Sequence, residues 1–338
     1  MGSAKSLNIL VIFDVGFKPP SNHDYSELFE TEEWETERDI VRTLKKLGHE
    51  VRTFGLQNDV LLLLDELRER RPDLIFNLCE AVGDDRGQEA NLVALFEMLK
   101  IPVTGAPSSA LALCKDKGLT KKILAYHRIK VPRFDVSHLR APLKKLTGIM
   151  WPAIIKPLHL EASEGISQVS LVDNEKDALE RLQFIHERFK TDAIIEEYIE
   201  GRELYVGVIG RERLTVLPPQ ELFFSEVPEG EPKIYTYKAK WDDAYRKKWG
   251  IHSDKAGPID DDVLRRIQGI CKKIFRLFQI RGYARFDLRL KPTGEVYFIE
   301  VNPNPAIARK DDFARSAKQF GWSYEDLLAR LVSMAAES

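Results

Sequence analysis

The chain has 338 residues, of which 43% are hydrophobic and 31% charged, and its formal net charge is -2. This length predicts two or three domains, and the near-neutral charge gives no electrostatic basis for nucleic-acid binding. No apolar stretch reaches the roughly 18 residues of a membrane span and no cleavable leader is recognisable, so we expect a cytoplasmic protein without a membrane partner.

The first third of the chain alternates apolar strand patterns with amphipathic helix patterns. The predicted strands cover residues 8–15, 51–56, 73–78 and 101–105, and the predicted helices between them cover 36–47, 59–70 and 87–100. This succession predicts a parallel sheet with helices on both faces over residues 1–105. The loop at 77–87 follows a predicted strand and is a candidate site loop, although a polar surface loop has the same pattern.

The remaining residues show a different order of elements. Over 106–195 we expect a small α+β unit, with helices at 108–127 and 174–189 around strands at 152–157 and 167–172. Over 196–338 strands dominate, followed by a long helix at about 260–278, two further strands and a final helix, which predicts an antiparallel sheet. The three cysteines, Cys79, Cys114 and Cys271, have no metal-ligand or redox spacing, so we expect them to be reduced and buried.

Two alternating strand patterns near the C-terminus carry the strongest chemical signal. Residues 283–290 and 295–302 flank the turn-forming stretch 291–294. We predict a register in which Leu290 pairs with Glu295, which places Arg285 opposite Glu300. Because side chains alternate along a strand, one face of the hairpin then carries four polar residues. They are Arg285, Asp287, Glu300 and Asn302.

Two carboxylates and an amide on one face are hard oxygen ligands of the kind that Mg²⁺ prefers. Arg285 beside them is suited to stabilising negative charge that develops during group transfer. An ordinary salt-bridged sheet face has the same composition and is a commoner feature than a metal site.

Other charged residues favour a metal site over an ordinary salt-bridged sheet face. Lys156 ends a predicted strand before a loop that contains Gly165, as a phosphate-binding lysine does, and Lys117 is a second candidate. A lone lysine at a strand end is more often solvated. The segment 194–203 offers an apolar strand with acidic residues after it, where Glu203 could bind a ribose.

These features, in this order, resemble the ATP-grasp superfamily and specifically the D-alanine:D-alanine ligase family. The likeness covers nearly the whole chain, through the segments 104–124, 152–157, 164–167, 194–210, 237–241, 284–290 and 295–305. The resemblance implies an N-terminal α/β pre-ATP-grasp domain over 1–105, followed by a two-part ATP-grasp fold. Its central subdomain with a lid loop would cover 106–195, and its C-terminal subdomain with the Mg²⁺ site would cover 196–338.

The resemblance also implies roles for individual residues. It assigns ATP and Mg²⁺ or Mn²⁺ as cofactors, with Asp287, Glu300 and Asn302 as the metal ligands. Arg285 would stabilise the acyl phosphate and the tetrahedral intermediate, and Lys240 would close over the γ-phosphate. The implied nucleotide-binding residues are Lys117, Lys156, Ser163, Glu196, Glu197, Ile199 and Glu203.

The chain departs from the family at three places. In the lid, Glu161 and Ala162 precede Ser163 where the family has Gly-Ser-Ser. The compact Gly-Gly loop of the family is replaced by a long acidic segment, in which Glu35 is a candidate for contact with a substrate. Ala306 replaces a common glycine, and Asp311 lies near the position of a serine that binds a substrate carboxylate. An aspartate there would repel a free α-carboxylate.

We therefore predict an ATP-dependent ligase that joins a small carboxylate to an amine through an acyl phosphate, with altered substrate specificity. An authentic D-alanine:D-alanine ligase is the alternative within the same family. A non-catalytic ATP-binding regulatory protein is the alternative of another class, which an intact Arg285 disfavours. The family also implies a homodimer.

Overall fold

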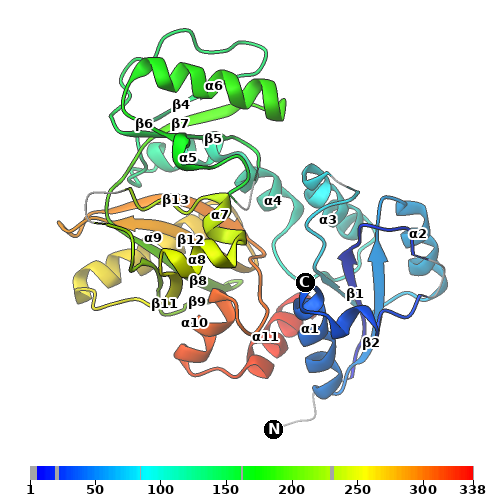
Figure 1. Ribbon diagram of the computed structural model, residues 1–338. Helices are drawn as coiled ribbons and strands as arrows, with labels where there is room; N and C mark the ends of the chain where they lie inside the picture. The colour runs from blue at the N-terminus through cyan, green and yellow to red at the C-terminus, as the bar shows by residue number, and fades with distance from the viewer. Residues whose placement is uncertain (1–5, 20–22, 84, 161–162, 229–231, 338) are drawn as a thin grey trace.

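The computed structural model describes residues 6–19, 23–83, 85–160, 163–228 and 232–337 (Figure 1). The fold combines α/β and α+β parts, as predicted. A three-stranded parallel sheet lies at one end of the molecule, and two antiparallel sheets of six and four strands form the rest. Within the described residues no helix is long and apolar enough to span a membrane.

The N-terminal sheet has the strand order β2-β1-β3, with β1 at Asn8–Asp14, β2 at Glu50–Leu56 and β3 at Leu74–Asn77. Alternate β1 residues pack on opposite faces. One set meets α1 (Glu35–Lys46), and the other meets α2 (Val60–Glu69) and α3 (Glu89–Met98). Asp59 caps α2 by accepting a hydrogen bond from the Leu61 backbone N–H. The predicted layers are therefore confirmed.

The predicted strand at 101–105 is wrong, because only a single bridge forms between Val103 and Ile75. Pro102 has no N–H to donate to a ladder, and Gly105 turns the chain away at a φ of +98°. This segment instead leads out of the N-terminal sheet towards α4 (Ser108–Lys115).

The six-stranded sheet has the order β11-β10-β8-β12-β13, with β9 (Leu214–Val216) pairing with β8 (Arg202–Gly210). Its other strands are β10 (Gln220–Phe224), β11 (Ile251–Lys255), β12 (Gly282–Leu290) and β13 (Val296–Pro303). The helix α9 (Asp261–Leu277) packs on the sheet through Ile267, Cys271 and Ile274, which are fully buried. All three cysteines are free and buried, as expected.

The four-stranded sheet has the order β4-β7-β5-β6 and is antiparallel throughout. Its strands are β4 (Phe134–Ser137), β5 (Ala153–Pro157), β6 (Leu171–Val172) and β7 (Ala193–Glu197), and α6 (Glu175–Phe189) packs on it. The predicted strand at 167–172 is mostly wrong, since η4 (Gln168–Ser170), a 3₁₀ turn, occupies its first part. The predicted helix at 108–127 breaks at Asp116, which adopts an extended conformation and caps α5 (Lys117–Tyr126).

Two helices, not one, end the chain, because Gly321 adopts a left-handed conformation between α10 (Asp312–Phe320) and α11 (Tyr324–Ala336). Short elements complete the fold. They are η1 (Leu28–Glu30), η2 (Glu32–Trp34), η3 (Arg86–Gln88), α7 (Tyr237–Trp241) and α8 (Asp243–Lys248).

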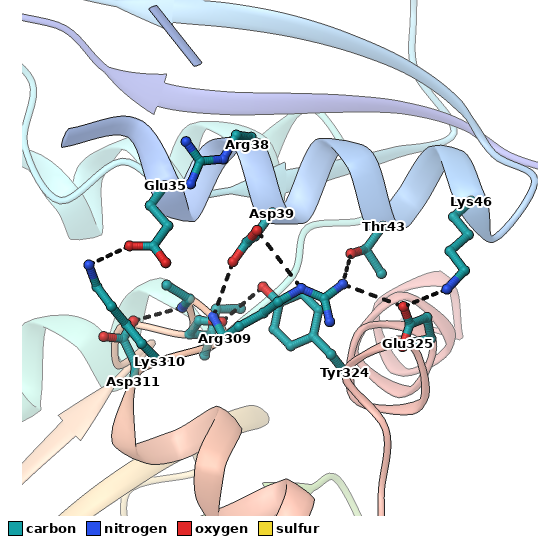
Figure 2. Close-up of polar contacts among 12 residues, drawn as sticks. Glu35, Arg38, Asp39, Thr43, Lys46, Arg309, Lys310, Asp311, Tyr324 and Glu325 are labelled. Carbon is teal, nitrogen blue, oxygen red and sulfur yellow. Dashed lines mark hydrogen bonds and ion pairs between the residues drawn. The ribbon is translucent and has the colours of Figure 1, made fainter. Parts of the chain in front are cut away.

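A polar cluster joins α1 of the N-terminal part to the C-terminal segment that follows β13 (Figure 2). Arg309 donates to Thr43 Oγ1 at 3.1 Å, and its guanidinium lies 4.3 Å from the centre of the Tyr324 ring. The Arg309 backbone N–H donates to Asp39 at 3.3 Å, and Glu325 accepts from Lys46 at 3.0 Å. The segment that continues from the strand β13 is thereby fixed against the N-terminal helix.

Candidate active site

The hairpin of β12 and β13 has a different register from the one predicted. Leu290 pairs with Val296 rather than with Glu295, and a β-bulge follows between Asp287 and Leu288. Beyond the bulge Asp287 lies opposite Glu300 and Arg285 lies opposite Asn302. The predicted pairs are therefore wrong, although the four predicted side chains do share one face.

The bulge is what brings the four side chains together. On β13, Phe298 and Val301 point into the core, whereas both Ile299 and Glu300 between them face outward. Continuing the Leu290–Val296 register without a bulge would place Asp287 opposite Ile299 and turn Glu300 inward. The extra residue thus turns Glu300 towards Asp287.

Arg285 and Asp287 form a bidentate ion pair. The Nε and Nη2 atoms of Arg285 donate to the two carboxylate oxygens of Asp287 at 2.8 and 2.9 Å, and Asn302 Nδ2 donates to the same carboxylate at 3.1 Å. The guanidinium also lies 4.7 Å from the centre of the Tyr205 ring. Burial and the neighbouring charge of Glu300 raise the pKa of Asp287 to about 6, against the opposing effect of Arg285.

Lysines from α5 and β5 lie beside Glu300, the cross-strand partner of Asp287. Lys117 begins α5, donates to the Leu160 carbonyl at 2.7 Å and lies 3.5 Å from Glu300 Oε1. Lys156 on β5 pairs with Glu196 on β7, and both are more than nine-tenths buried. Although burial disfavours the Glu300 carboxylate, Lys117 and Lys156 together lower its pKa.

The sequence-based predictions missed Lys121. It lies one helical turn after Lys117 on α5 and is only 1% exposed, with its Nζ 3.2 Å from Glu196 Oε2. The spacing of four residues in the stretch "KGLTK" was the available signal, because such residues lie on one face of a helix.

One cavity of about 140 Å³ lies between the two antiparallel sheets. Eleven of the predicted residues line it: Lys156, Ser163, Glu196, Glu197, Ile199, Glu203, Lys240, Arg285, Asp287, Glu300 and Asn302. Segments far apart in the sequence thus form one site, and Lys117 reaches it through Glu300.

The lid and α7 close one side of this cavity. Ser163 donates to the Tyr235 carbonyl at 2.9 Å, and the backbone N–H of Tyr237 donates to the Ile166 carbonyl at 3.0 Å. Lys240 lines the cavity, and burial together with the charge of Arg285 lowers its pKa. The predicted lid departures at Glu161 and Ala162 lie outside the described residues.

The predicted ribose ligand Glu203 is already engaged by protein groups. It pairs with Arg289 at 2.6 Å and accepts from the Tyr205 hydroxyl at 2.9 Å. Arg289 also donates to the Lys233 carbonyl at 3.1 Å, and this hydrogen bond ties β12 to the segment before α7. Arg289 and Tyr205 were both missed by the sequence-based predictions.

Three predicted substrate residues do not line the cavity. Glu35 pairs with Lys310 at the interface between α1 and the segment after β13 (Figure 2). Asp311 accepts from the Ala308 backbone N–H at 2.7 Å and so closes a local turn. Ala306 is exposed in the same segment.

Three other carboxylates lie together at the carboxyl edge of the parallel sheet. Asp14 ends β1 and accepts from the Glu80 backbone N–H at 2.9 Å, and Glu37 lies in the first turn of α1. Burial and the charges of Asp14 and Glu80 raise the pKa of Glu37 to about 7. The charge of Glu80 also raises the pKa of Lys240, against the larger effect of burial, so this carboxylate lies within electrostatic range of Lys240.

A family model described as "D-ala D-ala ligase C-terminus" matches residues 94–333, which is well over half of the chain. The chain belongs to the D-alanine–D-alanine ligase family. It is therefore an ATP-grasp ligase of the D-Ala–D-Ala ligase type, a class of enzymes that form C–N bonds with release of ADP.

Individual relatives agree with this assignment. The D-alanine–D-alanine ligase of Aquifex aeolicus is 28% identical over 302 residues, which cover 88% of this chain and 94% of that protein. The crystal structure of the Bacillus anthracis D-alanine–D-alanine ligase complexed with ATP aligns with a TM-score of 0.74 at 19% identity, over 98% of both chains. The VanG D-Ala:D-Ser ligase of Enterococcus faecalis aligns with a TM-score of 0.70 at 20% identity, over 98% of this chain and all of that one.

The residues present fit a divalent cation of the Mg²⁺ type. Asp287 and Glu300 are direct cross-strand partners, and Asn302 beside them carries an amide oxygen as a third candidate ligand, while its amide nitrogen donates to Asp287. No group of three or more His, Cys, Asp or Glu side chains with metal-binding geometry occurs in the described part of the chain. Two carboxylates and an amide leave positions for water and phosphate oxygens, as Mg²⁺ requires.

The raised pKa of Glu37 predicts a pH-dependent stability. Because the folded state holds this proton up to about pH 7 and the unfolded state only to about 4.5, the folded protein binds more protons between these values. The free energy of unfolding should therefore fall as the pH rises from 4.5 to 7, by about 3 kcal/mol for this group. In Glu37→Gln, urea denaturation at pH 5, 6, 7 and 8 should show a flatter pH dependence.

The exposed Glu27 provides the matched control, because Glu27→Gln removes the same charge and Glu27 is not among the charges that raise the pKa of Glu37. That variant should keep the slope of the wild type. An unchanged slope in Glu37→Gln would contradict the assignment.

Proposed function

We propose that this protein is an ATP-dependent carboxylate–amine ligase whose substrate pair differs from two molecules of D-alanine. The observation that supports the chemistry is the single cavity that combines Arg285, the metal-type ligands and the lysines. The proposed substrates are small molecules, and the family implies a homodimer. We also propose the domain division given above, with its second boundary near the end of β7.

The residues that line the cavity have different proposed roles. Lys117 and Lys156 hold the phosphates of ATP, and Glu196, Glu197 and Ile199 lie beside the adenine. Asp287, Glu300 and Asn302 would hold Mg²⁺, which would supply neutralisation of the phosphate charge. Lys240 closes over the γ-phosphate from α7.

The proposed reaction has two steps, the formation of an acyl phosphate and its attack by an amine, and both occur in this cavity. A carboxylate oxygen of the first substrate attacks the γ-phosphorus, the bond to ADP breaks, and an acyl phosphate forms. The neutral amine of the second substrate then attacks the acyl carbon, releases phosphate and loses a proton to form the amide. Arg285 stabilises the negative charge on the acyl oxygen, and the lid contact through Ser163 excludes water.

Two observations support an altered substrate pair. Asp14, Glu37 and Glu80 place three carboxylates at one edge with Arg86 paired to Glu80 at 2.6 Å, and the surplus of negative charge favours a first substrate with more than one positive charge or donor. In the turn from Ala306 to Asp311, Asp311 stands near the position of a serine that binds a substrate carboxylate in the family, but here its carboxylate accepts from the Ala308 backbone N–H. The VanG structure, described as a D-Ala:D-Ser ligase, has the same fold and a second substrate other than D-alanine.

An authentic D-alanine–D-alanine ligase is the second candidate. The Aquifex aeolicus relative favours this candidate, because it is named a D-alanine–D-alanine ligase and matches 88% of this chain. The two candidates differ in the product.

Incubation with ATP, Mg²⁺ and pooled amino acids and amines, followed by mass detection of condensed products, separates them. We expect release of ADP that requires both a carboxylate and an amine, and a product other than D-alanyl-D-alanine. D-alanyl-D-alanine as the preferred product would support the second candidate.

A further inference from the structure

We propose that Lys121 is a positioning residue that holds the β13 bulge and thereby presents Glu300 to the metal. This inference rests on the proposed metal site. Lys121 does not line the catalytic cavity, whereas Lys117, one turn before it, contacts Glu300 directly.

Two contacts of Lys121 are with the residues at the bulge. Its Nζ donates to the carbonyl of Ile299, the residue that the bulge adds between Phe298 and Glu300. The same Nζ lies 5.9 Å from the centre of the Phe298 ring. One buried ammonium group therefore binds the backbone of the residue immediately before the metal ligand.

The backbone contact has a geometric consequence. A bulge leaves a carbonyl without its ladder partner, and an unpaired buried carbonyl is costly. The charged donor of Lys121 satisfies the Ile299 carbonyl and so favours the bulged register over the regular one. In the regular register Glu300 would face the core, where it could not bind a cation.

The ion pair with Glu196 gives the buried ammonium group a counter-ion. Glu196 Oε2 is fully buried and makes no hydrogen bond within the described residues, so the ion pair with Lys121 at 3.2 Å compensates its charge. Lys156 pairs with the other oxygen of the same carboxylate. When Lys156 turns to a phosphate, Lys121 still neutralises Glu196.

A purely structural ion pair is the competing explanation. Such a pair would affect stability when it is broken, and it would leave the metal site as it is. The two explanations therefore predict different behaviour of the segment 296–303 and of the metal dependence of nucleotide binding.

The test compares Lys121→Met with Lys122→Met, an exposed lysine next to it on the same helix that carries the same charge. Hydrogen exchange of the ligand-free protein should show at least about tenfold faster exchange in the segment 296–303 of Lys121→Met alone. Calorimetric titration with ADP, with and without Mn²⁺, should show that the metal-dependent gain in affinity falls about tenfold.

Lys121→Gln keeps the experiment decisive where Lys121→Met fails to fold, because its amide can still donate to the Ile299 carbonyl. We expect this variant to retain more of the protection of 296–303 and more of the metal-dependent gain. Normal protection and an unchanged metal-dependent gain in a variant with a lower melting temperature would overturn the proposal.

The hydrogen-exchange measurement needs no ligand. If the wild type binds no ADP in either condition, the proposed nucleotide site fails, while the exchange of 296–303 still decides whether Lys121 holds the bulge. The two failures are thus distinguishable.

Discussion

Glu300→Gln is expected to lower the turnover of ATP by about 10²- to 10³-fold while the protein stays folded. Glutamine preserves the shape of the side chain but removes the negative charge that faces Asp287 across β12 and β13. It also removes the counter-ion of Lys117, which lies 3.5 Å away. We therefore expect the variant to bind Mg²⁺ more weakly and to position the phosphates of ATP less well.

The measurement is the initial rate of ADP release at a series of Mg²⁺ concentrations. Glu295→Gln is the matched control, because Glu295 lies at the other end of the hairpin and pairs with the exposed Lys130. That variant should behave as the wild type does. Unchanged activity in Glu300→Gln would remove Glu300 from the metal site.

Arg285→Met should give a loss of similar size in kcat, about 10²- to 10³-fold, with a smaller change in the KM for ATP. The guanidinium stabilises negative charge that develops in the transition state, so its loss lowers kcat. The KM changes less because ATP is bound mainly by other groups. The substitution also leaves the Asp287 carboxylate without its bidentate partner, which should cost about 3 kcal/mol of stability.

A double variant separates these two effects. Arg285→Met combined with Asp287→Asn removes both charges, so the free energy of unfolding should recover relative to Arg285→Met alone. Activity should stay low, because both proposed functional groups are absent. Arg285→Lys keeps the charge without the fork geometry and should retain part of the activity. Full activity in Arg285→Met would contradict its assigned role.

Much of the fold followed from local patterns. The alternation of apolar runs and amphipathic helices predicted the parallel sheet, because each pattern reports which faces are buried. Boundaries were less predictable where single residues decide them. Asp116 divides one predicted helix into two by capping the second, and Gly321 divides another.

The candidate site was predictable as a set of residues and less so as a geometry. Residues with period-two spacing on β12 and β13 were assigned to one face, but a bulge is not visible in a pattern of alternating side chains. The side chains that contact Glu203 were missed for different reasons. Arg289 has the same period-two spacing as Arg285 and Asp287, which was an available signal, whereas Tyr205 comes from an apolar strand pattern.

The substrate end was the least predictable part. Glu35 and Asp311 were predicted to contact a substrate. In the structure Glu35 pairs with Lys310, and Asp311 accepts a hydrogen bond from the Ala308 backbone N–H. Asp14 and Glu80 come from the ends of two different strands, and only the parallel pairing of those strands brings them together. Long-range pairing of this kind leaves no local signal.

The product screen tests the central claim most directly. The wild-type protein is incubated with ATP, Mg²⁺ and pooled carboxylates and amines, and hydroxylamine in a parallel sample converts an acyl phosphate to a detectable hydroxamate. The account predicts ADP release that depends on the carboxylate, a hydroxamate of that carboxylate, and an amide product other than D-alanyl-D-alanine. D-alanyl-D-alanine as the dominant product would contradict the altered specificity, and the absence of any carboxylate-dependent ADP release would contradict the ligase function itself.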